Sequence, residues 1–256
     1  MLAHQRQKRL VDLLSRRGQL TVGEIRSHFR ASPATVRRDL AELAQRGAVV
    51  RTHGGVIHPA SLQGEPVFQQ RVRHALRAKK AIAAEAVHRL GDAVTVYIDS
   101  GTSALAVAQL LLPRRDLTLF TNSLPLLLAG RSDGARIVSP GGELRVPSQS
   151  LVGSLALTWM SHLRFDVAFI GASGLQAQDG ASVTSLEEAA MKQAAMARAR
   201  RVILVAGAAK WNSPAAVGVA PWSAFHLWVT DAALSRAERS AIEKQGVDVC
   251  MVKAGS

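Results

Sequence analysis

The sequence predicts an α/β protein of two domains, in which a small helical domain with a β-hairpin precedes a larger domain built on a mostly parallel sheet. Three observations lead to this prediction. Residues 1–57 contain three short amphipathic stretches with helix start and stop signals. Residues 58–66 contain two prolines, a glycine and small residues, as a linker does. Across 67–256, short β-branched segments alternate with helical stretches, which is typical of a parallel sheet covered on both faces.

The charge is concentrated in the first third of the chain. Of the 256 residues, 48% are hydrophobic, which is enough for a packed core, and the formal net charge is +13. Residues 1–80 carry 16 Lys and Arg against 5 Asp and Glu, whereas residues 81–256 carry 16 against 14. This asymmetry favours a localised site for a polyanion such as nucleic acid. A membrane surface fits poorly, because the basic segments lack large apolar anchors.

Several function classes have no support in the sequence. No apolar run approaches the roughly 18–20 residues that span a bilayer, and the N-terminus lacks the apolar core of a secretory signal. We therefore expect a cytoplasmic protein. Cys250 is the only cysteine, so neither an internal disulfide nor a cysteine-based zinc site is expected. Motifs for nucleotide, metal or hydrolase chemistry are missing, so we expect no cofactor, no metal and no catalytic residue.

Two helices are expected before residue 30. Apolar residues such as Leu10 recur at helical spacing in a first helix that ends near Gly18. The segment Thr21–Glu24 matches a capping box, in which hydroxyl and carboxylate each bond the other's backbone amide. A second helix should therefore extend over about Val22–Phe29.

A third helix should begin after Ser32. Ser32 can cap it, and Pro33 suits its first position, where an N–H is not needed. Gly47 should end it as a left-handed cap. One face is an apolar stripe of Val36, Leu40 and Leu43, and the other carries small residues and arginines, namely Ala34, Thr35, Arg37 and Arg38. A short helix of this kind fits the DNA major groove, since arginine forks match guanine edges or phosphates.

Residues 48–57 predict two short strands around a glycine turn, which would be the wing of a winged helix-turn-helix. The string Ser32–Leu40, followed by Arg51-Thr52-His53-Gly54-Gly55, resembles the N-terminal signature of the DeoR family of bacterial transcriptional regulators. The resemblance implies a domain that binds an operator. His53 is either a phosphate contact or a solvated turn residue. The predicted DNA-binding residues are Ser32, Ala34, Thr35, Arg37, Arg38, Arg51 and His53.

The second domain should open with one helix from about Val67 to Leu90, ending at Gly91. Its basic first half either extends the DNA contact or faces water. Seven strands are expected at about 94–99, 117–121, 136–139, 166–171, 202–206, 225–230 and 247–252. Helices are expected at about 103–112, 154–162, 186–199 and 235–245, and Ser185 with Glu188 and Ser235 with Glu238 match capping boxes.

Polar turns follow three of these strands, and ligands bind such sheets at the carboxyl ends of the strands. The turn 99–103 passes from strand to helix through hydroxyl residues around Gly101, and bare amides at a helix start can bind an anion. Thr121-Asn122-Ser123 and Gly141-Gly142-Glu143 are the other two turns. The alternative is that all three are ordinary connections.

These turns resemble those of the C-terminal sensor domain of the DeoR family, which is similar to sugar-phosphate isomerases. The resemblance implies that residues 100–103 hold the phosphate of a phosphorylated sugar or related metabolite. It also matches Glu188 and Lys192 to a family pair on a long helix, although two such residues can form a plain surface pair. The predicted effector-binding residues are Asp99, Ser100, Gly101, Thr102, Ser103, Asn122, Gly142, Glu188, Lys192 and Lys210.

Two positions depart from the family pattern. Gly207 stands where an aspartate usually precedes the lysine at 210 by three residues, and Ser173 stands where an acidic residue is common. Losing these carboxylates should weaken recognition of sugar hydroxyls or favour a more acidic ligand.

Together these features predict a transcriptional regulator whose affinity for its operator depends on a bound metabolite. The family resemblance implies a repressor, the most frequent role in the family. Because one recognition helix contacts few base pairs, a homodimer or homotetramer is expected. The main alternative is a sugar-phosphate isomerase that carries a DNA-binding domain. Its chemistry needs a positioned base, such as Asp99 or Glu188, but the carboxylate usual near Lys210 is missing, so we expect no enzyme activity. An architectural DNA binder would leave the second domain unexplained.

Overall fold

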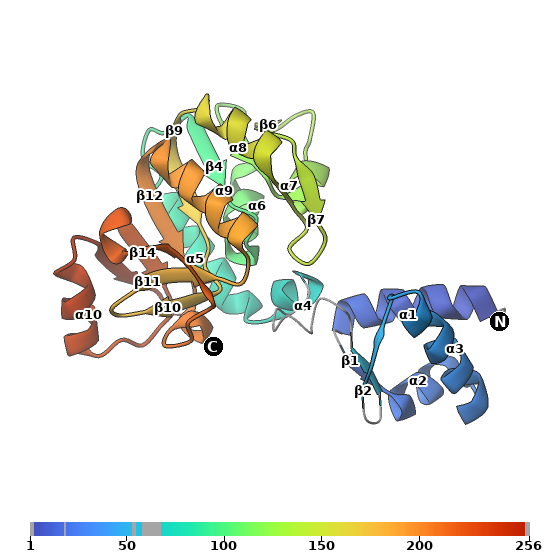
Figure 1. Ribbon diagram of the computed structural model, residues 1–256. Coiled ribbons are helices and arrows are strands. Elements are labelled where there is room, and N and C mark those ends of the chain that lie inside the picture. Colours follow the sequence, from blue (N-terminus) through green and yellow to red (C-terminus); the bar gives the residue numbers. More distant parts are fainter. Residues whose placement is uncertain (1–2, 18, 53–54, 58–67, 254–256) are drawn as a thin grey trace. The chain divides into compact units, whose positions relative to one another are not determined.

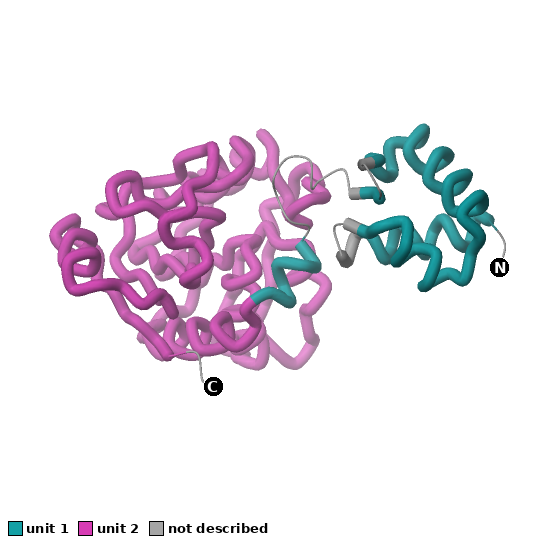
Figure 2. The backbone as a smooth tube through the Cα atoms, turned by 90° about the horizontal axis from the view of Figure 1, so that it is seen from below, with its two compact units in different colours: residues 1–74 teal, residues 75–256 magenta. Residues whose placement is uncertain are grey.

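A computed structural model describes residues 3–17, 19–52, 55–57 and 68–253. The chain folds into two compact units, residues 1–74 and 75–256 (Figure 2). The segment 58–66, predicted to be the linker, lies outside the described residues.

Unit 1 contains the three predicted helices α1 (Ala3–Arg17), α2 (Val22–Phe29) and α3 (Pro33–Gln45). The capping box of Thr21 with Glu24 forms at α2, and Gly47 has the expected left-handed conformation after α3. The wing strands β2 (Val50–Thr52) and β3 (Gly55–Ile57) are joined by a third strand, β1 (Gln19–Thr21), in the order β1-β3-β2. Strand β1 was not predicted, because three residues are too few to show a period of two.

The single helix predicted over 67–90 is wrong. The structure has α4 (Phe68–Arg73) and α5 (Leu76–His88), and the chain turns between them at Ala75, whose φ is +51°. A left-handed alanine costs about 1–2 kcal/mol and leaves no mark in the sequence. Packing supplies the reason for the break, since each helix buries its own apolar residues: Phe68 on α4, and Ala78, Ile82, Ala83 and Ala86 on α5.

All seven strands predicted for the second domain are confirmed, and all lie in one fully parallel sheet of order β15-β14-β12-β9-β4-β5-β6. In chain order they are β4 (Thr95–Ile98), β5 (Thr118–Thr121), β6 (Arg136–Val138), β9 (Phe165–Ile170), β12 (Ala199–Val205), β14 (Leu227–Thr230) and β15 (Asp248–Met251). Figure 1 shows α8 and α9 in front of this sheet, with α5 and α6 behind it.

The remaining helices are α6 (Thr102–Leu111), α7 (Leu124–Leu128), α8 (Ser154–Ser161), α9 (Leu186–Ala197) and α10 (Arg236–Glu243), with short 3₁₀ turns at Ala208–Lys210 and Trp222–Ala224. Helix α7 was not predicted. Five short antiparallel strands were also missed: the hairpin β7 (Glu143–Arg145) and β8 (Ser150–Val152), and the sheet of β10 (Gly174–Gln176), β11 (Gly180–Val183) and β13 (Val217–Ala220).

The strand order places a topological switch point between β4 and β9. The chain builds β4, β5 and β6 in one direction and then crosses to β9 on the other side of β4. Ligands of such sheets bind in the crevice outside the carboxyl ends at this point. The β7–β8 hairpin is attached to the same edge, because Leu151 N donates to Asn122 O at 2.7 Å and Leu124 N donates to Gln149 O at 2.9 Å.

Candidate functional sites: a nucleic-acid interface and an anion site

Helix α3 buries one face and exposes the other, as predicted. Val36, Leu40 and Leu43 lie in the core of unit 1, whereas Ala34, Arg37 and Arg38 are exposed. At its start, Ser32 Oγ accepts a hydrogen bond from Thr35 N at 3.2 Å, and the two hydroxyls lie 2.8 Å apart. The cap therefore fixes the end of the helix that carries the arginines. Arg51 is exposed on β2, and His53 lies outside the described residues.

Behind this exposed face, a buried ion pair that the sequence analysis missed ties α3 to α1. Asp39 is only 3% exposed and accepts from Arg6 Nε at 2.5 Å and from Arg6 Nη2 at 3.1 Å. Gln7 Nε2 also donates to Asp39, and to Glu42 at 2.6 Å. The hydrogen bond that Arg6 donates to the Asp39 carboxylate raises the pKa of Arg6. Because the partners are more than 30 residues apart, no local pattern revealed them.

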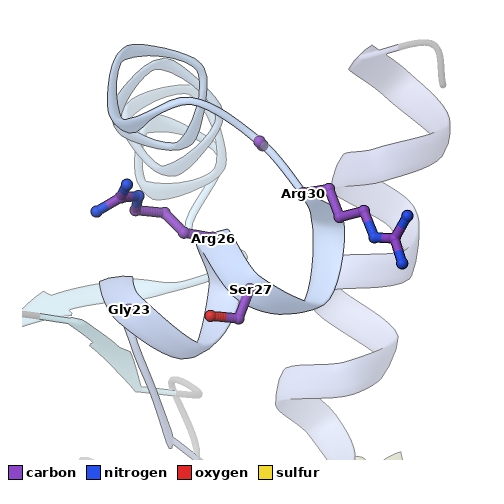
Figure 3. A pocket seen from close by; sticks show the side chains of 5 residues that line it. Gly23, Arg26, Ser27 and Arg30 are labelled. Carbon is purple, nitrogen blue, oxygen red and sulfur yellow. The ribbon is translucent and has the colours of Figure 1, made fainter.

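Two further arginines lie beside the turn that connects α2 to α3. Arg26 and Arg30 line a shallow hollow together with Gly23, Ser27 and Ala31 (Figure 3). Arg30 ends α2 in a left-handed conformation, and its amide donates to Arg26 O. Both side chains are exposed, so this turn adds two cations to the surface near the start of α3.

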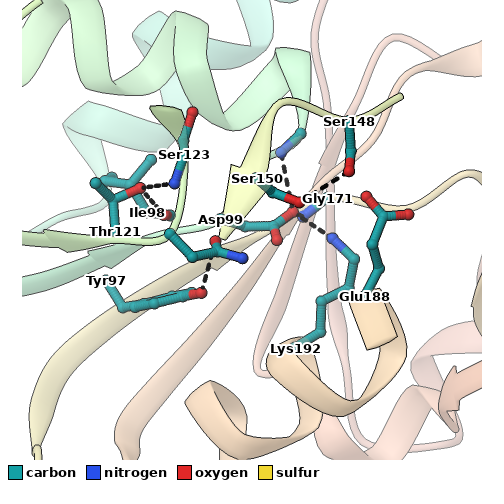
Figure 4. A network of polar contacts seen from close by, with 12 residues as sticks. Tyr97, Ile98, Asp99, Thr121, Ser123, Ser148, Ser150, Gly171, Glu188 and Lys192 are labelled. Carbon is teal, nitrogen blue, oxygen red and sulfur yellow. Dashed lines mark hydrogen bonds and ion pairs between the residues drawn. The ribbon is translucent and has the colours of Figure 1, made fainter. Parts of the chain in front are cut away.

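In unit 2, the structure brings Asp99, Gly101 and Lys192 together at the switch point. Asp99 is 1% exposed, and its Oδ2 accepts from Lys192 Nζ, from Gly171 N at 3.0 Å and from Gly101 N at 3.3 Å (Figure 4). Lys192 is also buried. A buried charge is tolerated when it is paired and hydrogen-bonded, and this carboxylate links the ends of β4 and β9 to α9.

Beside this pair, the start of α6 has the form of an anion site. Gly101 is its N-cap, with extended backbone, and no described side chain caps the helix. Gly101, Thr102 and Ser103 are partly exposed, whereas Ser100 is buried. A Cβ on Gly101 would lie 3.2 Å from Asp99 Oδ2, so a residue without a side chain suits this position. Uncapped first-turn amides attract negative charge.

The two other predicted turns support the architecture of this edge. Asn122 is buried, with Tyr97 Oη donating to its Oδ1 at 3.0 Å and its Nδ2 donating to Leu151 O at 3.0 Å. Burial, and then the charge of Asp99, raise the pKa of Tyr97 well above its usual value. Gly142 has φ of +117°, and a Cβ there would lie 2.5 Å from Val152 O. Asn122 thus holds β8 by a hydrogen bond, and Gly142 allows a close approach to β8. Contact of either residue with a ligand stays a prediction.

Glu188 and Lys192 lie one turn apart on α9 and are both buried, so the surface-pair interpretation is wrong. Ser185 caps α9 by accepting from Glu188 N, and its hydroxyl donates to Glu187. Arg145 of β7, which was not predicted, reaches Glu188: its Nη1 lies 3.9 Å from Glu188 Oε2 and donates to Ser148 Oγ at 3.0 Å. The side chain of Arg145 is only 13% exposed.

The structure gives a physical reason for the glycine at 207. A Cβ there would lie 2.8 Å from Asp231 Oδ1, and that same oxygen accepts from Ala208 N at 2.7 Å. A carboxylate from the end of β14 therefore lies against the position where the family usually has its own. Lys210 follows in the 3₁₀ turn after β12, two strands from β4.

The comparisons with known proteins agree with this architecture. Residues 6–61 match the DeoR-like helix-turn-helix domain, and residues 74–232 match the DeoR C terminal sensor domain. The chain belongs to the DeoR family. It is therefore a transcriptional regulator that combines a DNA-binding domain with a sensor domain.

Similar proteins include the HTH-type transcriptional regulator GlpR of Haloferax volcanii, at 33% identity over 97% of this chain and 98% of that one. The glycerol-3-phosphate regulon repressor of Escherichia coli is 32% identical over 89% and 90%. The transcriptional repressor AccR of Agrobacterium fabrum is 33% identical over 81% of both chains. Among solved structures, ribose 5-phosphate isomerase A of Methanocaldococcus jannaschii covers 52% of this chain and 53% of its own, with a TM-score of 0.39 and 14% identity.

Among the described residues, no helix is both long and apolar enough to cross a bilayer. Nor do three or more of their His, Cys, Asp and Glu side chains gather where they could hold a metal ion.

Proposed function

We propose that this regulator is a repressor that binds its operator through α3 and the wing, and that a phosphorylated sugar or related metabolite, bound at the carboxyl edge of the parallel sheet, changes its affinity for DNA. The observation that carries the proposal is the uncapped, partly exposed start of α6 at the switch point, next to the buried pair of Asp99 and Lys192. The name of the Escherichia coli relative supports glycerol 3-phosphate as a first probe.

The DNA side of the proposal assigns contacts to the exposed start of α3. Arg37 and Arg38 read base edges or phosphates, with Ser32, Ala34 and Thr35 beside them. Arg51 and His53 of the wing contact phosphates. Arg26 and Arg30 add phosphate contacts from the neighbouring turn. Since one such helix covers a short half-site, the proposal includes a homodimer or homotetramer that binds repeated half-sites, and it places the protein in the cytoplasm with its DNA.

The effector side assigns the phosphate to the amides and hydroxyls of residues 100–103, with Asn122, Gly142 and Lys210 around the remainder of the ligand. Binding can control DNA affinity only if the ligand prefers one of two arrangements of the protein.

A regulator without enzyme activity fits the site better than an isomerase. A general base has to reach the proton that it removes. Asp99 is almost inaccessible, and its Oδ2 already accepts three hydrogen bonds. In this arrangement the carboxylate supports the site and does not face a substrate.

Fluorescence anisotropy tests the proposal. The full-length protein is titrated onto labelled DNA from upstream of its own gene at fixed salt, with and without a pool of sugar phosphates that includes glycerol 3-phosphate. We expect specific binding that weakens when the pool is added. Binding no tighter than to unrelated DNA of equal length would refute the operator assignment, and specific binding that no pool member changes would refute the effector assignment.

A further inference from the structure

We infer that Arg145 binds the anionic group of the effector directly, and that Glu188 holds this arginine when the effector is absent. This inference rests on the proposed function and deepens it, because it gives the effector site a residue outside the strand-end turns. In this arrangement, a carboxylate of the protein and a phosphate of the ligand compete for one guanidinium.

The hairpin position of Arg145 brings its charge to the site. Strand β8 bonds to the segment that follows β5 and contacts α9, and β7 pairs with β8 through Arg145 and Ser150. The guanidinium points inward, toward Ser148 and Glu188. Glu188 in turn lies one helical turn before Lys192, whose partner Asp99 also accepts from the N-cap amide of α6. Arg145 is thus linked through adjacent charged groups to the expected phosphate position.

The two cations beside the expected phosphate position already have carboxylate partners. Lys192 pairs with Asp99, and Arg145 lies 3.9 Å from Glu188. Glu187, the neighbour of Glu188 on α9, is exposed, and its pKa is lowered by the Ser185 hydroxyl first and also by the charge of Arg145. A phosphate that contacts Arg145 directly therefore competes with the carboxylate of Glu188 for the guanidinium.

The contact of Arg145 with Glu188 is the longer of these two ion pairs. Lys192 Nζ donates a hydrogen bond to Asp99, whereas Arg145 Nη1 and Glu188 Oε2 are 3.9 Å apart. A phosphate offers a guanidinium two parallel hydrogen bonds of about 2.7–2.9 Å, which are stronger than a contact at this distance. Exchange of Glu188 for the ligand is therefore the easier rearrangement.

The test compares two substitutions that remove opposite charges from the same pair. Binding of glycerol 3-phosphate and of inorganic phosphate is measured by calorimetry on the full-length protein, and thermal melting confirms that each variant is folded. Arg145→Ala should raise the dissociation constant at least tenfold, and Arg145→Lys should raise it less. Glu188→Gln should lower it several-fold. Arg131→Ala, which removes an exposed arginine paired with Asp133, should leave it unchanged.

The double variant separates competition from general damage. If Glu188 acts only by holding Arg145, then Glu188→Gln should give no gain in affinity when Arg145 is already alanine. Unchanged affinity in Arg145→Ala, or weaker affinity in a folded Glu188→Gln variant, would overturn the inference while leaving the proposed function in place. If the wild-type protein binds neither these probes nor any other sugar phosphate, the proposed effector function fails, and the inference fails with it.

Discussion

The two candidate sites hold their charges in opposite ways. On α3, Arg37 and Arg38 are exposed, whereas Asp99, Glu188 and Lys192 at the carboxyl edge of the sheet are buried. Exposed arginines bind a polyanion by adding contacts and displacing its counterions. At the proposed effector site the charged side chains already have partners within the protein, so an anion that contacts one of them directly has to replace that partner. Under the proposed function, the exposed arginines bind DNA and the buried groups respond to the ligand.

The largest expected effect comes from breaking the buried pair. Lys192→Met leaves the carboxylate of Asp99 buried without its cation, and we expect the free energy of unfolding of unit 2 to fall by about 3–5 kcal/mol. Urea denaturation followed by tryptophan fluorescence measures this, because all four tryptophans lie in unit 2. Arg131→Met, at an exposed ion pair, is the control and should not move the midpoint. If Lys192→Met and Arg131→Met unfolded at the same urea concentration, burial would not distinguish the two ion pairs.

The next effect is on DNA. Arg38→Ala should weaken operator binding by about 1–3 kcal/mol if the side chain reads a base, and should leave the unfolding of unit 2 unchanged. Anisotropy at fixed salt measures the loss. Arg46→Ala makes the same charge change at the other end of α3, where the side chain is also exposed, and should cost much less. If both variants lost the same amount of DNA affinity, α3 would contribute only its overall positive charge, and Arg38 would make no specific base contact.

A smaller effect is expected from the cap that orients α3. Ser32→Ala removes the hydroxyl that accepts from Thr35 N, and helix caps of this type contribute about 1 kcal/mol. Hydrogen exchange at the Thr35 amide should accelerate by the corresponding factor of about five. Ser27→Ala, on the exposed side of α2, is the control and should leave this rate unchanged. Unaltered protection in Ser32→Ala would show that the cap does not hold the helix start.

The smallest effect concerns the amino edge of the sheet, far along the strands from the effector site. Asp166 accepts from Val94 N, Thr95 N and Thr95 Oγ1, and the Thr95 bonds lower its pKa below the usual 3.8. A carboxyl group with a lowered folded pKa contributes stability above its unfolded pKa and loses it as the pH falls through the folded value. Asp166→Asn should therefore lower the melting temperature at pH 7, by an amount that shrinks only below about pH 4. A difference from wild type that is independent of pH down to pH 2 would contradict this account.

Local signals explain how much of the fold was predictable. The caps Ser32 and Thr21 and the stripe of α3 are sequence-local, and the β-branched strands of the parallel sheet are continuous apolar runs, so both were predicted. The break at Ala75 and the hairpin at 143–152 were missed, since the first depends on packing and the second on strands of three residues.

The candidate sites divide in the same way. The exposed face of α3 and the glycine turn at 101 were predicted because neighbouring residues specify them. The pair of Arg6 with Asp39, the contact of Arg145 with Glu188, and the position of Asp231 beside Gly207 all join residues distant in sequence. No single segment carries information about such pairs. The partners of these charged side chains were therefore the part of the two sites that could not be predicted from the sequence.

The central claim, that reading and switching are separate functions of the two units, is tested most directly by titrating glycerol 3-phosphate and the sugar-phosphate pool against wild type, Arg38→Ala and Thr102→Glu on the same labelled DNA. A glutamate at 102 is favourable at the start of α6, but its carboxylate fills the expected phosphate position and repels an anion there. We predict that Arg38→Ala loses DNA affinity but still binds the effector, and that Thr102→Glu binds DNA normally but no longer responds. A normal response in Thr102→Glu would contradict the account.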